Sequence, residues 1–356
     1  MVNKFAFIIH PLDITDYYRK FNWAKKLPDN VLKRMVKYLP PITISHITGI
    51  KSRVGTEVEG YFFACPLTSE QMITLPEEFV INKIVKTCQK AENFGVDIIG
   101  LGAFTSVVGD KGITIENQIN TAVTTGNSYT VGTAIKSIQM AANEMNLDFL
   151  NETVTIIGAT GSIGWTVSKI LGDNTRDLQL VARNRDKLIK LKNELKASNK
   201  NLNVTITLNV KEALKESKII VSASGAVKSL INPRDLLPGS VVCDVARPRD
   251  VAEKVTEKRN DVLVIEGGIV EVPGNVDFNF NFGYPPGTSY ACMAETIILT
   301  LEGKFINYTL GPKVKEKKVK EIMSLADKHG FSITDLRGKS DVLPAQKLEE
   351  IKAMVR

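Results

Sequence analysis

The sequence is poor in the residues that most often hold metals or cross-link secreted proteins. It has 4 cysteines and 3 histidines in 356 residues, and neither type recurs at the spacing of a metal site. The cysteines lie far apart, with no C-x-x-C pair; they are Cys65, Cys88, Cys243 and Cys292. This argues against a zinc site and against a disulfide framework, and it predicts a protein of the reducing cytoplasm.

Long apolar runs are also missing. No stretch approaches the roughly 20 residues that a membrane-spanning helix needs. The early FAFII segment is short and leads into His10 and Pro11, so we expect a first strand and not a signal peptide. The net charge of +7 favours an acidic partner, although solvated helix faces would explain it equally well. No nucleic-acid-binding motif accompanies the lysines, so nucleic acid is not expected as a partner.

Strand-like and helix-like runs alternate along most of the chain, which is typical of an α/β protein with a doubly wound parallel sheet. We predict an α/β substrate-binding or carrier-binding domain (1–127), a bridging helix (128–149), a Rossmann-type NADPH-binding domain (150–273) and a mostly helical C-terminal segment (274–356). The strands expected first are 42–51, 58–64 and 96–108, and those of the Rossmann-type domain are 154–157, 178–181, 204–208, 219–223, 240–245 and 262–265. The clearest helices are expected at 77–94 and 128–145.

The most informative segment is VTIIGATGSIGWTVSKIL, residues 154–171, which has the pattern of a strand, a glycine turn and a helix. Glycine lets the backbone approach a pyrophosphate, and the helix start offers free N–H groups and a positive dipole end. A turn that only packs a helix on a strand is the alternative. The cofactor-binding residues predicted at this turn and at the end of strand 219–223 are Gly158, Thr160, Gly161, Ser162, Ile163, Gly164, Ala223 and Ser224.

The second strand of this domain ends in Arg183, Asn184 and Arg185. The adenosine ribose lies at this position in the Rossmann fold, where an acidic residue would bind its 2′-hydroxyl group. Two guanidinium groups suit a 2′-phosphate instead. We therefore predict NADPH as the cofactor, with these three residues in its site; two solvated surface arginines are the alternative.

A candidate nucleophile lies in GYPPGTSYACMAE, residues 283–295. The Pro/Gly loop cannot be helical, and Thr288 or Ser289 could cap a helix that begins near residue 291. Cys292 then lies in the first turn, where the helix dipole and free N–H groups favour a thiolate and could stabilise an oxyanion. We predict Cys292 as the nucleophile; a small buried hydrophobic residue is the alternative.

The other candidates fit structural roles better. Cys88 lies on an apolar helix face and Cys243 lies within a strand, whereas Cys65, at a strand end, is ambiguous. His10 and His46 could donate protons, but hydrogen-bonded structural histidines are commoner.

Several segments far apart in the chain match, in the same order, segments of one known family. They are ITGIKSRVGTEVEGYFFACPL, GVDIIGLGAFTSVV, TTGNSYTV, IIGATGSIG, LVARNRDKL, IEGGIVEVPG and YACMAETIILTLEG. The chain resembles the long-chain acyl-(acyl carrier protein) reductases known from cyanobacteria. This resemblance implies NADPH-dependent reduction of a fatty acyl thioester, on acyl carrier protein or coenzyme A, to a fatty aldehyde through an acyl-cysteine. The Ala-Cys-x-Ala-Glu segment of that family matches residues 291–295 and assigns the nucleophile to Cys292, without an active-site metal.

One segment departs from this resemblance. Residues 244–251, DVARPRDV, look more like the corresponding strand end of glutamyl-tRNA reductases, which also use a cysteine thioester. Two alternatives stay open: another NADP-dependent oxidoreductase on a shikimate dehydrogenase or glutamyl-tRNA reductase scaffold, and a nucleotide-binding regulator without turnover. The usual lysine/aspartate pair of shikimate dehydrogenases is not readable here, and an intact Cys292 weighs against a regulator.

Overall fold

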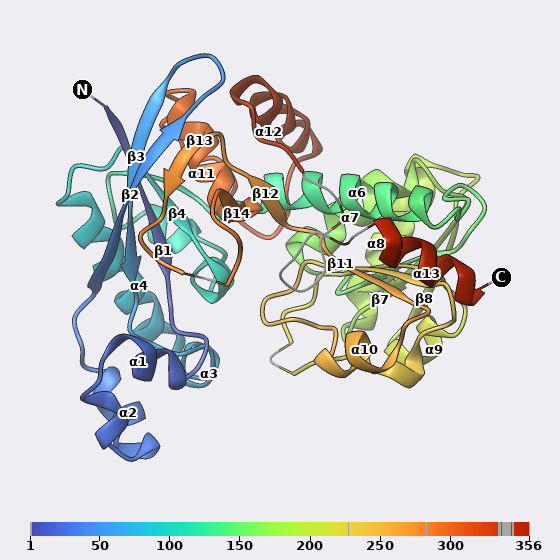
Figure 1. Ribbon diagram of the computed structural model, residues 1–356, viewed down its shortest axis with the longest axis horizontal. Coiled ribbons are helices and arrows are strands. Elements are labelled where there is room, and N and C mark those ends of the chain that lie inside the picture. Colours follow the sequence, from blue (N-terminus) through green and yellow to red (C-terminus); the bar gives the residue numbers. More distant parts are fainter. Residues whose placement is uncertain are drawn as a thin grey trace.

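The computed structural model describes residues 2–226, 228–281, 283–333, 336, 343 and 345–355. The chain forms two lobes, each built on a six-stranded sheet, and helix α6 (Asn127–Glu144) runs between them (Figure 1). The α/β class predicted from the sequence is confirmed. Among the helices of the described ranges, none has the length and apolar character needed to cross a bilayer.

The sheet of the first lobe is mixed, in the order β13-β2-β3-β1-β4-β5. Strands β1, β3, β4 and β5 are parallel, whereas β2 and β13 run antiparallel to their neighbours. Their bounds are β1 Asn3–Ile9, β2 Ile42–Lys51, β3 Glu57–Ala64, β4 Ile98–Leu101, β5 Ala122–Thr124 and β13 Gly274–Asp277. Because β13 follows the second lobe in sequence, the chain returns to complete the first sheet.

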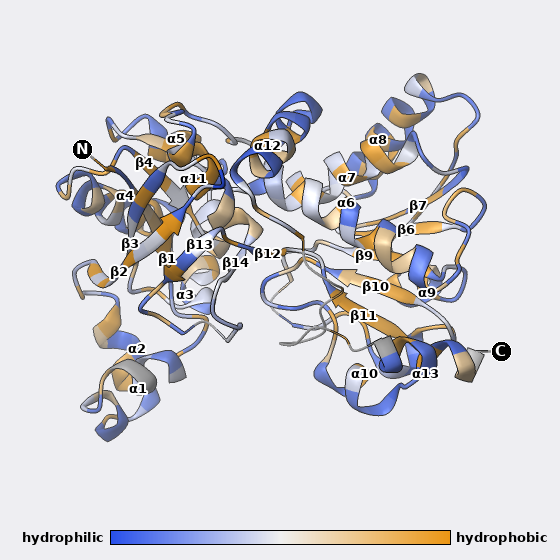
Figure 2. Ribbon diagram, turned by 45° about the horizontal axis from the view of Figure 1, so that its top comes forward, coloured by the Kyte–Doolittle hydropathy of each residue, from blue (hydrophilic) through white to orange (hydrophobic). Residues whose placement is uncertain are grey.

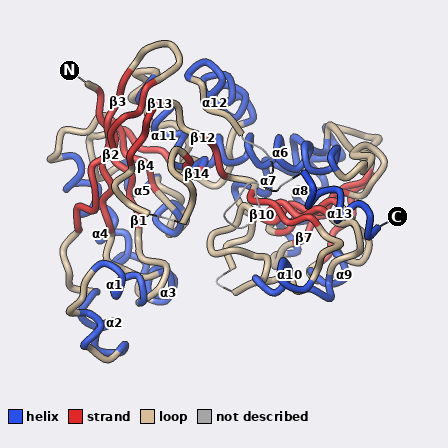
Figure 3. The backbone as a smooth tube through the Cα atoms, viewed as in Figure 1, coloured by secondary structure: helices blue, strands red, loops and turns tan. Residues whose placement is uncertain are grey.

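Helices cover both faces of this sheet. Apolar side chains of α11 pack with Phe5, Phe7 and Phe62 on one face, and those of α3 and α4 pack with Ala6, Ile8 and Phe63 on the other. The helices outside the second sheet are α1 Thr15–Lys20, η1 Ala24–Lys26, α2 Asp29–Val36, α3 Ser69–Thr74, α4 Glu77–Glu92, η2 Ala103–Ser106, α5 Ile113–Glu116, α11 Ala291–Leu301 and α12 Glu316–His329. Strands β12 (Ile269–Glu271) and β14 (Thr288–Tyr290) form a separate antiparallel pair near α11 (Figure 3).

The sheet of the second lobe is parallel throughout, in the order β11-β10-β9-β6-β7-β8. Counted from β6, this is the 3-2-1-4-5-6 order of the Rossmann fold. The strand bounds, close to those predicted, are β6 Val154–Ile157, β7 Asp177–Val181, β8 Asn203–Thr207, β9 Ile219–Ser222, β10 Val241–Asp244 and β11 Leu263–Glu266. Strands β6, β9 and β10, in the middle of this sheet, are short and buried at every residue, as expected of strands covered on both faces.

Two layers of helix bury this sheet, and Figure 2 shows its apolar strands between them. Residues of α6, α7, α8 and α13 share one core with alternate strand residues such as Ile156 and Val221. Residues of α9, α10 and the neighbouring loops share the other, with Ile157 and Ile220. The helix bounds are α7 Ser162–Gly172, α8 Arg185–Ser198, α9 Val210–Leu214, η3 Pro233–Asp235, α10 Glu253–Lys258 and α13 Ala345–Val355.

Two local predictions were wrong. The strand expected over 96–108 ends at Leu101, because Gly102 and Ala103, the latter with a φ of +47°, turn the chain into η2. Neither Thr288 nor Ser289 caps α11, since both belong to β14 and the cap position is Tyr290.

Acidification should destabilise the protein partly through His10, which is a buried structural residue. Its Nε2 accepts a hydrogen bond from the Phe104 N–H at 3.1 Å, and its Nδ1 lies 2.9 Å from the Pro11 carbonyl oxygen. Burial lowers the pKa of His10 from 6.5 to about 4. The unfolded chain therefore takes up this proton first, and stability is lost as the pH falls through that interval, by at most roughly 3 kcal/mol.

Urea unfolding followed between pH 7 and pH 4 measures this loss. His10→Gln should flatten the pH profile relative to the wild type. Equal slopes in the wild type and His10→Gln would contradict the assignment.

Candidate functional site

The glycine turn after β6 is packed against the end of β9, where the strand order of the sheet reverses. Gly158 has a φ of +78°, and a Cβ atom there would lie 2.6 Å from the carbonyl oxygen of Ala223. A Cβ atom on Gly164 would lie 2.3 Å from the carbonyl oxygen of Gly158. Side chains are therefore excluded from both positions, and the turn lies at the carboxyl ends of the strands, where such sheets bind ligands.

Helix α7 begins at this turn without a side-chain cap. Its N-cap is Gly161, so the amide groups of the first turn, from Ser162 onward, remain available at the positive end of the helix. A tight turn free of side chains and an uncapped helix start fit the pyrophosphate of a dinucleotide. The predicted residues of the turn, together with Ala223 and Ser224, thus lie together at one edge of the sheet.

Arg183, Asn184 and Arg185 follow β7 at the same edge, and all three are exposed. The Asn184 Oδ1 caps α8 by accepting a hydrogen bond from the Lys187 N–H at 2.9 Å. This bond fixes the turn that presents the two arginines. The structure therefore gives Asn184 a local role, beside the cofactor contact predicted for it.

Cys292 lies at a junction of three helix starts. It is the second residue of α11 and is half-buried. A Cβ atom on Gly126, the N-cap of α6, would lie 2.3 Å from both the Cα and the carbonyl oxygen of Cys292. The next residue, Asn127, reaches the second lobe, because its Nδ2 donates to the Ser162 Oγ of α7 at 3.3 Å. The contact of Cys292 with Gly126 and the hydrogen bond of Asn127 with Ser162 thus connect the predicted nucleophile to the glycine turn.

Glu295, one turn after Cys292, connects α11 to neighbouring elements through hydrogen bonds. Its carboxylate is buried and accepts hydrogen bonds from the Tyr129 N–H at 2.8 Å, the Thr309 Oγ1 at 2.8 Å and the Thr124 Oγ1 at 2.5 Å. Tyr129 is the third residue of α6, so Glu295 supplies from α11 the cap that Gly126 lacks.

The helix start does not by itself make the Cys292 sulfur a thiolate. Burial raises the pKa of the Cys292 thiol to about 12, whereas the backbone N–H of Met293 and the charge of Arg247 act to lower it and Glu295 acts to raise it. The lowering expected from the helix start is present, but desolvation outweighs it in this state of the protein.

A second cluster at the strand ends was not predicted as part of the site. The Arg247 Nη2 and the Arg249 Nε both pair with the Glu266 carboxylate, the latter at 2.6 Å. The Tyr284 hydroxyl donates to the same carboxylate at 3.0 Å, and the Arg247 guanidinium lies 5.2 Å from the centre of the Tyr290 ring. The signal in the sequence is DVARPRDV, which contains both arginines.

Two aspartates hold this loop in shape. Asp244 accepts hydrogen bonds from the Ala246 N–H at 3.0 Å and the Val251 N–H at 2.9 Å, and burial raises its pKa to about 7. Asp250 accepts hydrogen bonds from the Ser222 Oγ at 2.7 Å and the Ser224 N–H at 3.0 Å. The arginine loop is therefore joined to the strand end against which the glycine turn packs.

The remaining cysteines and His329 fit structural roles. Cys65, Cys88 and Cys243 are buried, and burial raises the pKa of each thiol. His329 is buried between Ser52 and Glu302. Within the part of the chain that the structure describes, no three His, Cys, Asp or Glu side chains group as metal ligands.

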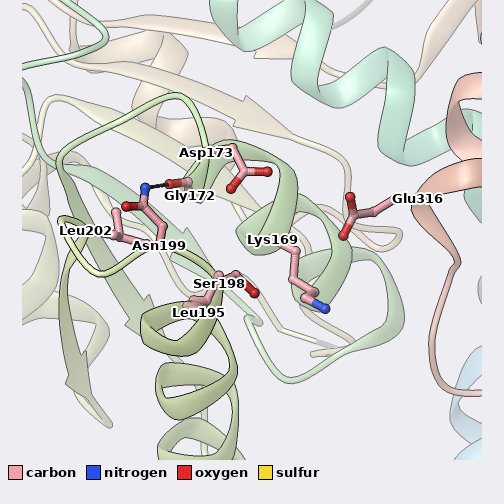
Figure 4. A pocket seen from close by; sticks show the side chains of 8 residues that line it. All are labelled: Lys169, Gly172, Asp173, Leu195, Ser198, Asn199, Leu202 and Glu316. Atoms are coloured by element: carbon pink, nitrogen blue, oxygen red, sulfur yellow. Dashed lines mark hydrogen bonds between the residues drawn. The ribbon is translucent and has the colours of Figure 1, made fainter.

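The structure also has a hollow away from the glycine turn. It has a volume of about 180 Å³ and sits at the far ends of α7 and α8, lined by Lys169, Gly172, Asp173, Leu195, Ser198, Asn199, Leu202 and Glu316 (Figure 4). The glycine turn is at the opposite end of α7, so this hollow plays no part in the site.

Known proteins resemble the chain over different parts of its length. A model of the shikimate/quinate 5-dehydrogenase family matches residues 139–266, which include the whole second sheet. The chain is 29% identical over 365 residues to the aminotransferase PigE of Serratia sp., covering 98% of this chain and 42% of that protein. It is 27% identical over 310 residues to a long-chain acyl-[acyl-carrier-protein] reductase of Synechococcus elongatus, covering 82% of this chain and 87% of the relative.

Other similarities are more distant. A glutamyl-tRNA reductase of Methanococcus maripaludis is 28% identical over 214 residues, covering 58% of this chain and 51% of that protein. The L-tryptophan dehydrogenase of Nostoc punctiforme is 12% identical, with a TM-score of 0.43, covering 92% of this chain and 80% of that one. The sheet order, the glycine turn and the family match together identify an NAD(P)-binding oxidoreductase scaffold of the shikimate dehydrogenase type.

The close approach of Gly126 to Cys292 leads to a stability prediction. Gly126→Ala should destabilise the protein more than Gly95→Ala, because both positions have a φ above +65° but a Cβ atom on Gly95 meets nothing within 4 Å. The left-handed backbone alone costs about 1–2 kcal/mol. Denaturant unfolding of the two variants isolates the clash, and equal losses would show that the α6–α11 contact is not tight.

Proposed function

We propose that this protein is an NADPH-dependent reductase that converts a long-chain acyl thioester, carried by acyl carrier protein or coenzyme A, into a fatty aldehyde through an acyl group on Cys292. One observation carries the proposal: Cys292 abuts Gly126, and the adjacent Asn127 is hydrogen-bonded to the helix that starts at the glycine turn. The similarity to the acyl-[acyl-carrier-protein] reductase extends over most of both chains and supports the same chemistry.

In the first half of the reaction, the Cys292 sulfur attacks the thioester carbonyl carbon. A new carbon–sulfur bond forms, the bond to the carrier sulfur breaks, and the carrier thiol leaves with the proton lost by Cys292. The amide groups at the start of α11 lie beside this sulfur and suit the oxyanion of the intermediate. Covalent attachment then holds the acyl carbonyl group at the junction of the lobes.

In the second half, the acyl group is reduced and released. The glycine turn and the open start of α7 would hold the pyrophosphate of the cofactor, and Arg183 and Arg185 its 2′-phosphate. When bound, NADPH supplies the hydride and its two electrons. The carbonyl carbon gains this hydrogen and the bond to the Cys292 sulfur breaks, which yields an aldehyde and returns the thiol after uptake of one proton.

Two related functions are weaker candidates. A shikimate dehydrogenase-type reaction does not use the cysteine at the junction, and the family match ends at residue 266, before Cys292. A regulator without turnover would not need a half-buried thiol near the glycine turn and the uncapped start of α7.

Removal of the nucleophile should abolish both acyl transfer and reduction. Incubated with an acyl thioester alone, the wild type should gain the mass of one acyl group on Cys292, and Cys292→Ala should gain none. With NADPH present, aldehyde formation by Cys292→Ala should fall by at least about 100-fold. Cys88→Ala, in α4 on the far side of the first sheet, is the matched control and should retain both reactions. Aldehyde formation at the normal rate by Cys292→Ala would refute the mechanism.

Cofactor choice should depend on the arginines after β7. Arg183→Ala should raise the KM for NADPH by roughly 10- to 100-fold, the equivalent of one charge-assisted hydrogen bond, and should leave the KM for NADH nearly unchanged. Lys187→Ala, an exposed cation in the first turn of α8, serves as the control for general loss of charge. Equal effects of Arg183→Ala on both cofactors would remove the 2′-phosphate assignment.

A further inference from the structure

The arginine loop after β10 reaches the start of the helix that carries Cys292. The Arg247 guanidinium lies over the ring of Tyr290, which is the N-cap of α11. Its ion-pair partner Glu266 precedes the Gly267–Gly268 turn, and the Gly268 carbonyl oxygen accepts the Ala291 N–H at 2.7 Å. Arg247 is thereby tied to the first turn of α11 from two sides.

Two guanidinium groups share the Glu266 carboxylate, and the Tyr284 hydroxyl donates to it as well. Asp244 and Asp250 of the same loop are hydrogen-bonded to backbone and serine groups at the strand ends. The Arg247 guanidinium lies against Tyr290, at the start of α11.

Arg247 also keeps an unused donor. Its Nη1 donates to the Ala246 carbonyl oxygen at 2.7 Å, and its Nη2 to Glu266 and, at 3.2 Å, to the Tyr284 hydroxyl. Within the described residues, its Nε is buried and has no hydrogen-bond partner. Arg249 differs, because its Nε is engaged with Glu266 and its side chain is more exposed.

Glu295, one turn after Cys292 in α11, also acts on the sulfur. Glu295 is held by donors of β5, α6 and the loop after α11, and Lys318 of α12 is the cation that acts on it. The charge of Glu295 raises the pKa of the Cys292 thiol and that of Arg247 lowers it. Arg247 is therefore a charged side chain that favours the thiolate of Cys292, in addition to the Met293 N–H.

We propose that Arg247 is a positioning residue that holds a positive charge at the start of the helix that carries Cys292 and so favours the thiolate that attacks the substrate. This role rests on the proposed function for its use in catalysis, but the effect on the sulfur exists in the free protein. It extends the site to the loop after β10.

Alkylation of Cys292 by iodoacetamide tests the role without substrate or cofactor. The rate follows the thiolate fraction, so it falls about tenfold for each unit by which the pKa rises. The modified peptide is quantified by mass spectrometry between pH 7 and pH 10, which separates Cys292 from the buried cysteines. Arg247→Gln should be alkylated about tenfold more slowly, with its pH profile moved upward.

Arg249→Gln is the matched control, because it breaks an ion pair with the same Glu266 without removing the guanidinium over Tyr290. Its alkylation should stay within about threefold of the wild type. Arg247→Lys keeps the charge and should be alkylated at close to the wild-type rate. If Arg247→Gln does not fold, the alkylation rate of Arg247→Lys is the test. Wild-type alkylation of folded Arg247→Gln, or slow alkylation of folded Arg247→Lys, would overturn the proposal. Aldehyde formation by Cys292→Ala would instead refute the proposed function.

Discussion

The contact between Gly126 and the backbone of Cys292 is the constraint on which the rest of the site depends. Helix α6 belongs to both lobes, since it packs on α11 and α12 and also on α7 and the second sheet. A residue with a side chain at position 126 would push α11 away, and Glu295 could not then reach the Tyr129 N–H at 2.8 Å. One glycine and one carboxylate thereby set the distance between the candidate nucleophile and the nucleotide-binding turn.

The same close packing creates an electrostatic problem. A sulfur enclosed by two helix starts loses water, and this loss disfavours its charged form more than the helix dipole favours it. The arginine loop addresses this conflict. The Arg247 guanidinium lies against Tyr290, at the start of α11, and its charge acts to lower the pKa of the Cys292 thiol. Burial of the sulfur and a charge that favours its thiolate form thus coexist at one place.

Most of the second lobe could be predicted from the sequence, because its strands are short apolar runs bounded by turns and its first turn contains Gly158 and Gly164 at positions that tolerate no side chain. The helix start at Cys292 was also predicted, although its cap was not, since Thr288 and Ser289 pair as a strand with β12. The Arg247–Glu266 cluster depends on contacts between a loop and a later strand end, and local periodicity carries no information about such contacts.

The division of the chain between the two lobes bears on which chemistry the scaffold performs. The part shared with the shikimate/quinate dehydrogenase family, residues 139–266, supplies the parallel sheet, the glycine turn and the arginine loop, but not Cys292. The sulfur comes from α11, whose apolar side chains are buried in the first lobe. A half with a dinucleotide-binding fold is thus joined, through α6, to a half that contributes the candidate nucleophile. Under the proposed function, the first lobe and its junction would decide which reaction the scaffold performs, and the similarity to the acyl-[acyl-carrier-protein] reductase, over 82% of this chain, extends beyond the family match.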